Sequence, residues 1–71
     1  MTCFYEIVDE DDYYLEMAVK IEILEHEVIR VISADSMLSD EEIRAYIAAY
    51  CKSYGVTDVS ATISLEGIER V

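Results

Sequence analysis

Carboxylates are the residues of this chain whose type and spacing could do chemistry. Asp9-Glu10-Asp11-Asp12 forms an uninterrupted acidic run, and Tyr13 and Tyr14 follow it directly. Adjacent carboxylates cannot all be buried, so we expect a surface loop. Exposed aromatic rings beside carboxylates suit a binding hot spot for a basic protein surface. We therefore predict a partner-binding patch made of Asp9, Glu10, Asp11, Asp12, Tyr13, Tyr14, Glu16 and Glu22.

The acidic run also invites comparison with a calcium loop. An EF-hand needs oxygen ligands at alternate positions, Gly at the sixth position and Glu at the twelfth. Counted from Asp9, those two positions hold Tyr14 and Lys20. The run therefore does not match an EF-hand, and we expect neither a bound metal nor another cofactor.

Candidates for catalysis are few. His26 is the only histidine and lies between Glu25 and Glu27, which favour its charged form but give it no nucleophile to activate. The chain has two glycines and no glycine-rich phosphate loop or zinc ligand set. Cys3 and Cys51 form no paired-cysteine motif, and we interpret them as two reduced core thiols. We predict that the protein is not an enzyme.

Net charge narrows the choice of partner. Sixteen acidic residues against five basic ones give a net charge of −11 and an isoelectric point near 4.1. Such a chain repels nucleic-acid backbones and anionic membrane surfaces, so we expect neither as a direct ligand and predict a basic protein partner. The sequence shows no apolar run long enough to span a membrane and no secretory signal pattern, which favours a cytoplasmic location.

The length of 71 residues allows a single domain, spanning 1–71. A chain this short buries only about 60% of the surface that it exposes when unfolded, so its core is small and dimerisation is an option. Alternating apolar residues predict strands at Cys3 to Val8 and Leu15 to Ile23. Further strands are expected at Val28 to Ser33 and Thr57 to Glu66, followed by a short tail that frays.

A helix is predicted from the segment Ser39 to Gly55. Ser39 and Glu42 match a capping box, Leu38 can contact Ile43 as a hydrophobic staple, and Gly55 can end the helix. Its apolar stripe consists of Ile43, Tyr46, Ile47, Tyr50 and Tyr54. The predicted fold is therefore α+β: a three-stranded antiparallel meander, one helix and a fourth strand (βββαβ), with the helix packed on one face of the sheet.

Strand register can be argued from the need to keep charge out of the core. If Leu24 lies opposite Val28 after a turn at Glu25-His26-Glu27, Glu22 faces Arg30 across the strands. Ile29 and Val31 then join the core face, and the last strand is expected to run parallel to the third. An alternative is that the segment from Leu24 to Ile32 is helical.

The sheet face away from the helix then resembles an interface with a charged rim. Its predicted members are Phe4, Glu6, Val8, Glu16, Ala18, Lys20, Glu22, Leu24, Val28, Arg30, Ile32, Asp58 and Glu66. Carboxylates two residues apart on a strand are ~6.6 Å from each other, close to the spacing of successive phosphates along a nucleic-acid strand. An acidic sheet could thus occupy a groove built for DNA or RNA.

In size, acidity, lack of catalytic motifs and alternating acidic strands, the chain resembles the small acidic inhibitors that phages use against host nucleases, the anti-restriction and anti-CRISPR proteins. The resemblance implies a DNA-mimicking inhibitor that acts in the host cytoplasm on the basic nucleic-acid-binding surface of a defence nuclease or CRISPR effector. The alternative function is a non-catalytic structural or accessory subunit that homodimerises through the sheet face away from the helix. A further interpretation is that the acidic residues serve only to keep the protein soluble.

Overall fold

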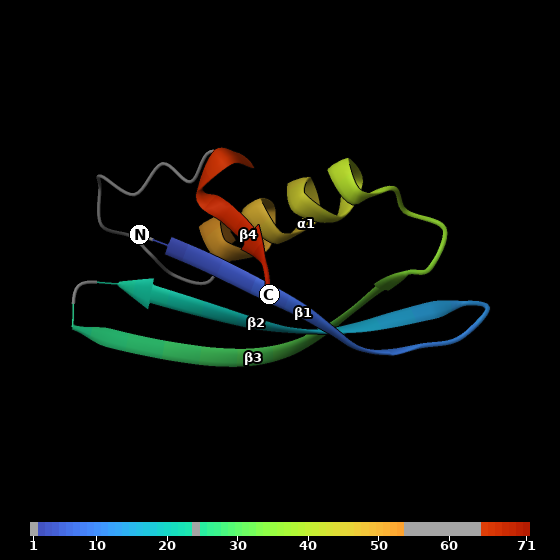
Figure 1. The fold of residues 1–71 in the computed structure, drawn as a ribbon, viewed down its shortest axis with the longest axis horizontal. Helices are drawn as coiled ribbons and strands as arrows, with labels where there is room; N and C mark the ends of the chain where they lie inside the picture. The colour runs from blue at the N-terminus through green and yellow to red at the C-terminus, as the bar shows by residue number, and fades with distance from the viewer. Residues whose placement is uncertain (1, 24, 54–64) are drawn as a thin grey trace.

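A four-stranded sheet with one helix on it makes up the described part of the chain (Figure 1). The computed structural model describes residues 2–23, 25–53 and 65–71. Within these ranges the elements are β1 (Thr2–Glu10), β2 (Tyr14–Ile23), β3 (His26–Asp35), α1 (Asp40–Ser53), a 3₁₀ turn (Leu65–Gly67) and β4 (Ile68–Arg70). The predicted βββαβ order is confirmed, and the segment around Val28 is a strand rather than a helix.

The strand order β3-β2-β1-β4 places the first strand in the interior of the sheet. β1 and β2 pair antiparallel, as do β2 and β3, and β4 pairs parallel with β1. It follows that β4 runs parallel to β3, as predicted, although the two lie at opposite edges. The helix α1 connects these edges across one face, which Figure 1 shows with α1 above the sheet.

The position of the fourth strand differs from the prediction. Ile68–Arg70, which we expected to fray, is the strand β4, and Glu66 belongs to the preceding 3₁₀ turn. Ile68 lies opposite Cys3 and is buried, and the Val71 amide donates a hydrogen bond of 2.8 Å to the Tyr5 carbonyl. Backbone pairing and one buried side chain hold this end of the chain. Residues 57–64 of the predicted strand lie outside the described residues.

The register between β2 and β3 also differs from the prediction. Ile23 pairs with His26, so His26 and Glu27 belong to β3 instead of the predicted turn Glu25-His26-Glu27, and Glu22 faces Glu27 instead of Arg30. This shift reverses the faces of β3: Ile29 and Val31 are 55% and 61% exposed. The prediction was wrong because it treated an inward Arg30 as a buried charge. β3 is an edge strand, and Arg30 on its inner side is exposed.

The helix begins where its capping box predicts. The Glu42 amide donates to Ser39 Oγ over 3.2 Å, and the Ser39 amide donates to Glu42 Oε1 over 3.0 Å. The side that α1 buries carries Ile43, Ile47, Ala48 and Cys51. Tyr46, which we placed in the apolar stripe, lies at its margin, where its hydroxyl donates to the Ser33 carbonyl over 2.8 Å. Tyr54 and Gly55 lie outside the described residues.

The core lies between α1 and the inner face of the sheet. It consists of Cys3, Tyr5, Leu15, Met17, Val19, Ile21, Ala34, Ile43, Ile47, Ala48, Cys51 and Ile68. Burying these side chains is the main favourable contribution to folding in a domain this small. Because α1 covers one face only, the opposite face of the same strands is free to carry other residues. We call that opposite face the outer face.

Candidate protein-interaction site

The outer face combines acidic and apolar side chains. Strand pairing assigns to it Thr2, Phe4, Glu6, Asp9, Tyr14, Glu16, Ala18, Lys20, Glu22, Glu27, Ile29, Val31, Ser33, Asp35 and Glu69. Among the described cations, only Lys20 occupies a pairing position on this face, since Arg30 and Arg70 lie opposite the inner residues Val19 and Tyr5. The outer face is therefore strongly anionic.

An apolar centre interrupts this acidic surface. Phe4, Ala18, Ile29 and Val71 line a shallow pocket of about 230 Å³, with Glu6 and Lys20 at its rim. Val31, directly opposite Ala18, extends the apolar surface along β3. An apolar centre with a charged rim is the usual composition of a protein-binding surface.

Lys20 is held in place by its neighbours on this face. Its Nζ lies 3.4 Å from Glu22 Oε1, 3.5 Å from Glu27 Oε2 and 5.7 Å from the centroid of the Phe4 ring. The hydrogen bond to Glu22 and the charge of Glu27 raise the pKa of the Lys20 ammonium above its usual value. At neutral pH the lysine is charged, and its single positive charge offsets one of the two charges of the directly opposed pair Glu22 and Glu27.

Among the described residues, a second opposed carboxylate pair has no lysine beside it, and the Asp9 carboxylate accepts one hydrogen bond of 2.9 Å, from the Glu10 amide. A bulge between Ile7 and Asp9 shifts the register of β1, so that Asp9 lies opposite Glu16 on the outer face. Neither carboxylate forms an ion pair within residues 2–23, 25–53 and 65–71. Like charges directly opposite each other destabilise a sheet. The fold thus carries an electrostatic cost at this position that a cationic partner would remove.

The acidic run forms the turn between β1 and β2. The Asp11 carboxylate accepts hydrogen bonds of 2.7 Å from the Tyr13 and Tyr14 amides, and the Asp11 amide donates to the Tyr14 carbonyl over 2.9 Å. The bonds from Tyr14 and then Tyr13 hold the pKa of the Asp11 carboxyl below its usual range. Asp11 therefore shapes the turn, and its charge is partly satisfied within the protein.

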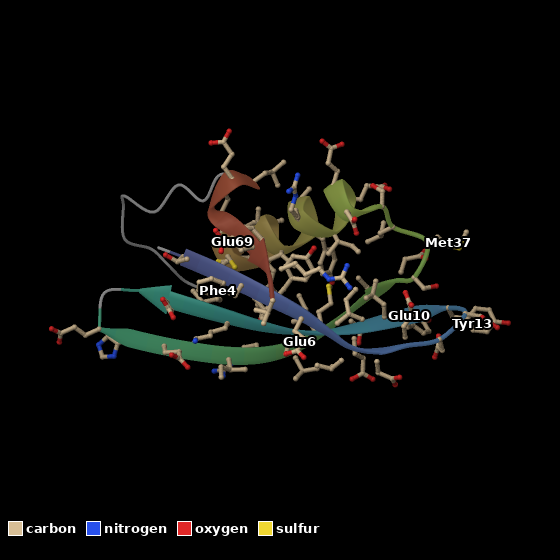
Figure 2. All side chains as sticks on the ribbon, viewed as in Figure 1. Phe4, Glu6, Glu10, Tyr13, Met37 and Glu69 are labelled. Atoms are coloured by element: carbon tan, nitrogen blue, oxygen red, sulfur yellow. The ribbon has the colours of Figure 1, made fainter. Side chains whose placement is uncertain are left out.

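The connection from β3 to α1 joins this turn to form one end of the molecule, which we call the acidic tip (Asp9 to Tyr14 with Asp35 to Met37). The Ser36 amide donates to the Tyr13 carbonyl over 3.2 Å, and Ser36 Oγ donates to the Asp12 carbonyl over 2.9 Å. Tyr13 and Met37 are 76% and 84% exposed, and Figure 2 shows them with Glu10 at this end. The tip thus presents exposed apolar side chains among carboxylates.

The structure brings together only part of the predicted patch. Asp9 and Tyr14, both in the acidic tip, lie on the outer face with the neighbouring Glu16, and Asp11, Asp12 and Tyr13 lie in the turn. Glu22 shares the outer face but lies six residues along β2 from Glu16, at a distance of about 20 Å. Glu10 lies opposite the buried Leu15 and is directed to the helix side of the sheet.

Several residues of the outer face and its pocket were not predicted: Thr2, Glu27, Ile29, Val31, Ser33, Asp35, Glu69 and Val71. The β3 residues were missed because of the register error, which placed Val28, Arg30 and Ile32 outward instead. The strand alternation of β3 contains the correct set, and the assumption of a two-residue turn would have found it. Leu24 and Asp58 lie outside the described residues.

The helix side has a different electrostatic character. A pocket of about 560 Å³ between α1 and β4 is lined by Tyr5, Asp40, Arg44, Leu65, Glu66, Ile68, Glu69 and Arg70. It combines guanidinium groups with carboxylates, so charges of both signs offset one another there. This pocket therefore lacks the concentration of negative charge that marks the outer face.

In the part of the chain that the structure describes, no three His, Cys, Asp or Glu side chains lie close enough to bind a metal ion. Over the same residues, α1 is too short to cross a membrane and too polar. Comparison of the chain with protein-family models, curated proteins and solved structures finds no significant match.

Proposed function

We propose that this protein is a small acidic protein-binding inhibitor whose outer face and acidic tip occupy the basic nucleic-acid-binding surface of a partner, such as a host defence nuclease or a CRISPR effector. The observation that carries the proposal is the composition of the outer face. It holds a row of carboxylates, a single paired cation and an apolar centre. Arg and Lys on such a partner would complement the rim, and its apolar groups would fill the centre.

The unbalanced pair Asp9 and Glu16 supports the proposal further. A surface that served only solubility could disperse its charges, which would avoid the repulsion between carboxylates directly opposite each other. A lysine or arginine of a partner placed between them would convert this repulsion into attraction. The net charge of −11 would also speed the encounter with a basic surface.

Paired carboxylates on the outer face suit the cationic surface of a nucleic-acid-binding partner. Neighbouring strands lie ~4.8 Å apart, and alternate residues along a strand lie ~6.6 Å apart. The outer face carries two carboxylate pairs across neighbouring strands, Asp9 with Glu16 and Glu22 with Glu27, about 20 Å apart along β2. Each pair could occupy a cationic position that otherwise holds a phosphate of DNA or RNA.

A homodimeric accessory subunit is the second candidate, because the apolar centre around Phe4 and Ile29 is exposed. Stacking two copies through this face would, however, oppose the carboxylates of one copy to those of the other. Charge therefore favours a basic partner over self-association. Light scattering at low and high salt distinguishes the homodimer from a monomer that binds a basic partner. A dimer formed through this face should appear only when salt screens the repulsion.

The test is displacement of nucleic acid from candidate effectors. Fluorescence anisotropy would follow labelled DNA or RNA bound to a panel of restriction nucleases and CRISPR effectors while the protein is added. We expect displacement from at least one effector, with an inhibition constant that rises steeply with salt. If the protein displaced nucleic acid from none of the effectors in the panel at low salt, the proposal would be contradicted for restriction nucleases and CRISPR effectors.

A matched pair of variants separates the outer face from overall charge. Glu6→Gln with Glu16→Gln removes two charges from the outer face, and Glu41→Gln with Glu66→Gln removes two exposed charges from the helix side. We expect the first pair to weaken inhibition about tenfold or more and the second to change it less than about threefold. Equal losses would mean that net charge alone, and not this surface, determines binding.

A further inference from the structure

The two cysteines of the chain meet in the core. Cys3 lies on the interior strand β1, opposite Ile21 of β2 and Ile68 of β4, and Cys51 lies near the end of α1. Both side chains are fully buried, and their Sγ atoms are 3.0 Å apart. A disulfide requires about 2.05 Å between the sulfur atoms, so a relative movement of about 1 Å would suffice to form it.

We infer that Cys3 and Cys51 are a site of covalent modification: they form an intramolecular disulfide that fastens the end of α1 to the interior of the sheet. The inference does not depend on the proposed function, since the cysteines lie on the helix side of the sheet. The oxidant is a low-molecular-weight disulfide. In a reducing compartment the pair remains a dithiol, as the sequence predicts.

The disulfide forms in two thiol–disulfide exchange steps. One cysteine thiolate attacks a sulfur of the small disulfide RSSR, the S–S bond breaks, and one thiolate RS⁻ leaves. The second cysteine then attacks the cysteine sulfur of this mixed disulfide, and the second RS⁻ leaves. The two protons of the protein thiols end on two RSH molecules, the protein loses two electrons, and RSSR is reduced.

Burial determines when the exchange can occur. Removal from water, together with the neighbouring Cys3 thiol, raises the pKa of the Cys51 thiol far above its usual range. Cys51 is therefore a poor nucleophile in the folded protein, and the burial of both sulfur atoms gives an oxidant no access. The bond is expected to form during folding, or when the last turns of α1 detach, and then to persist because the native structure holds the two sulfur atoms together.

The disulfide should stabilise the folded protein because it would close a long loop of the chain. The cysteines are 48 positions apart, so the cross-link would remove many conformations from the unfolded chain. It would also add a second connection between α1 and the sheet, five residues beyond the Tyr46 hydroxyl that bonds the Ser33 carbonyl. Both effects are expected to make the oxidised form the more stable one.

Redox equilibria of the wild-type chain test the inference. The reduced protein would be refolded in a series of reduced and oxidised glutathione mixtures, and a second series would be kept unfolded in urea. After acid quenching and alkylation, mass spectrometry would give the fraction with an internal disulfide. We expect the equilibrium constant for forming the bond to be about 100-fold larger under native conditions than in urea.

A ratio of about one or less would overturn the inference, because it would mean that the native structure does not favour the bond. The variants Cys3→Ala and Cys51→Ala are the controls: they should form glutathione adducts in urea, and no internal disulfide under either condition. As an independent readout, the oxidised wild-type protein should melt roughly 10 °C above the reduced protein. An unchanged or lower melting temperature would also contradict the inference.

Discussion

The two faces of the sheet differ although the same strands supply both. On β2 the inner residues Leu15, Met17, Val19 and Ile21 are fully buried beneath α1, whereas the residues between them, Glu16, Ala18 and Lys20, lie on the charged outer face. The inner face contributes the stability of the domain, and the outer face has a repulsive carboxylate pair that lowers it. The proposed function assigns the outer residues to contact with another molecule.

The largest expected effect is the loss of an inner side chain. Ile21→Ala should lower the free energy of unfolding by about 3 kcal/mol, because it leaves a cavity in a fully packed core. The same change on the outer face, Ile29→Ala, should cost less than about 1 kcal/mol, because Ile29 is exposed. Urea denaturation measures both losses of unfolding free energy. Equal losses would contradict the assignment of stability to the inner face.

Asp11 should matter more to stability than its neighbour Asp12, since its carboxylate accepts two amide hydrogen bonds in the turn. We expect Asp11→Ala to lower the urea midpoint more than Asp12→Ala at neutral pH. The pKa of Asp11 is lowered on folding, so its contribution is present above its unfolded pKa near 3.8 and is lost as pH falls through the lower folded value. The wild-type and Asp11→Ala midpoints should converge in that acidic range; a difference that persists below it would refute the assignment.

The smallest expected effect is a gain. Glu16→Gln should raise the free energy of unfolding by about 0.5 kcal/mol, because it removes the repulsion with Asp9. Glu22→Gln, on the same strand and face, should give no gain, because Lys20 already pairs with Glu22. The advantage of Glu16→Gln should shrink in 1 M salt, where the Debye length is about 3 Å. Stabilisation by Glu22→Gln equal to that by Glu16→Gln would argue against an uncompensated Asp9–Glu16 pair.

Local signals in the sequence were sufficient for most of the fold. Ser39 and Glu42 marked the start of α1 because capping depends on side chains only three positions apart. The strict alternation from Leu15 to Ile21 identified the buried side of β2 because that strand is interior and covered by the helix. The order of elements then followed from the strand and helix patterns.

Features that depend on pairing between distant segments were harder to predict. The bulge that turns Asp9 outward is visible only against its partner Glu16, and the register of β3 depended on a turn without Gly or Asn to identify it. Similarly, Ile68 forms a strand because Cys3 and Tyr5 offer a parallel partner at the sheet edge. The acidic outer face was therefore predicted in character, but its β3 and β4 members were not.

Localising a basic ligand on the protein by NMR tests the central claim most directly. A synthetic peptide rich in lysine and arginine would be titrated into isotope-labelled protein at low salt, and changes in backbone amide shifts would be mapped onto the sheet and the helix. We predict that the largest changes lie on the outer face and the acidic tip, around Glu6, Glu16 and Ile29, and that salt abolishes them. Changes concentrated on α1, or spread evenly over both sides of the molecule, would contradict the account.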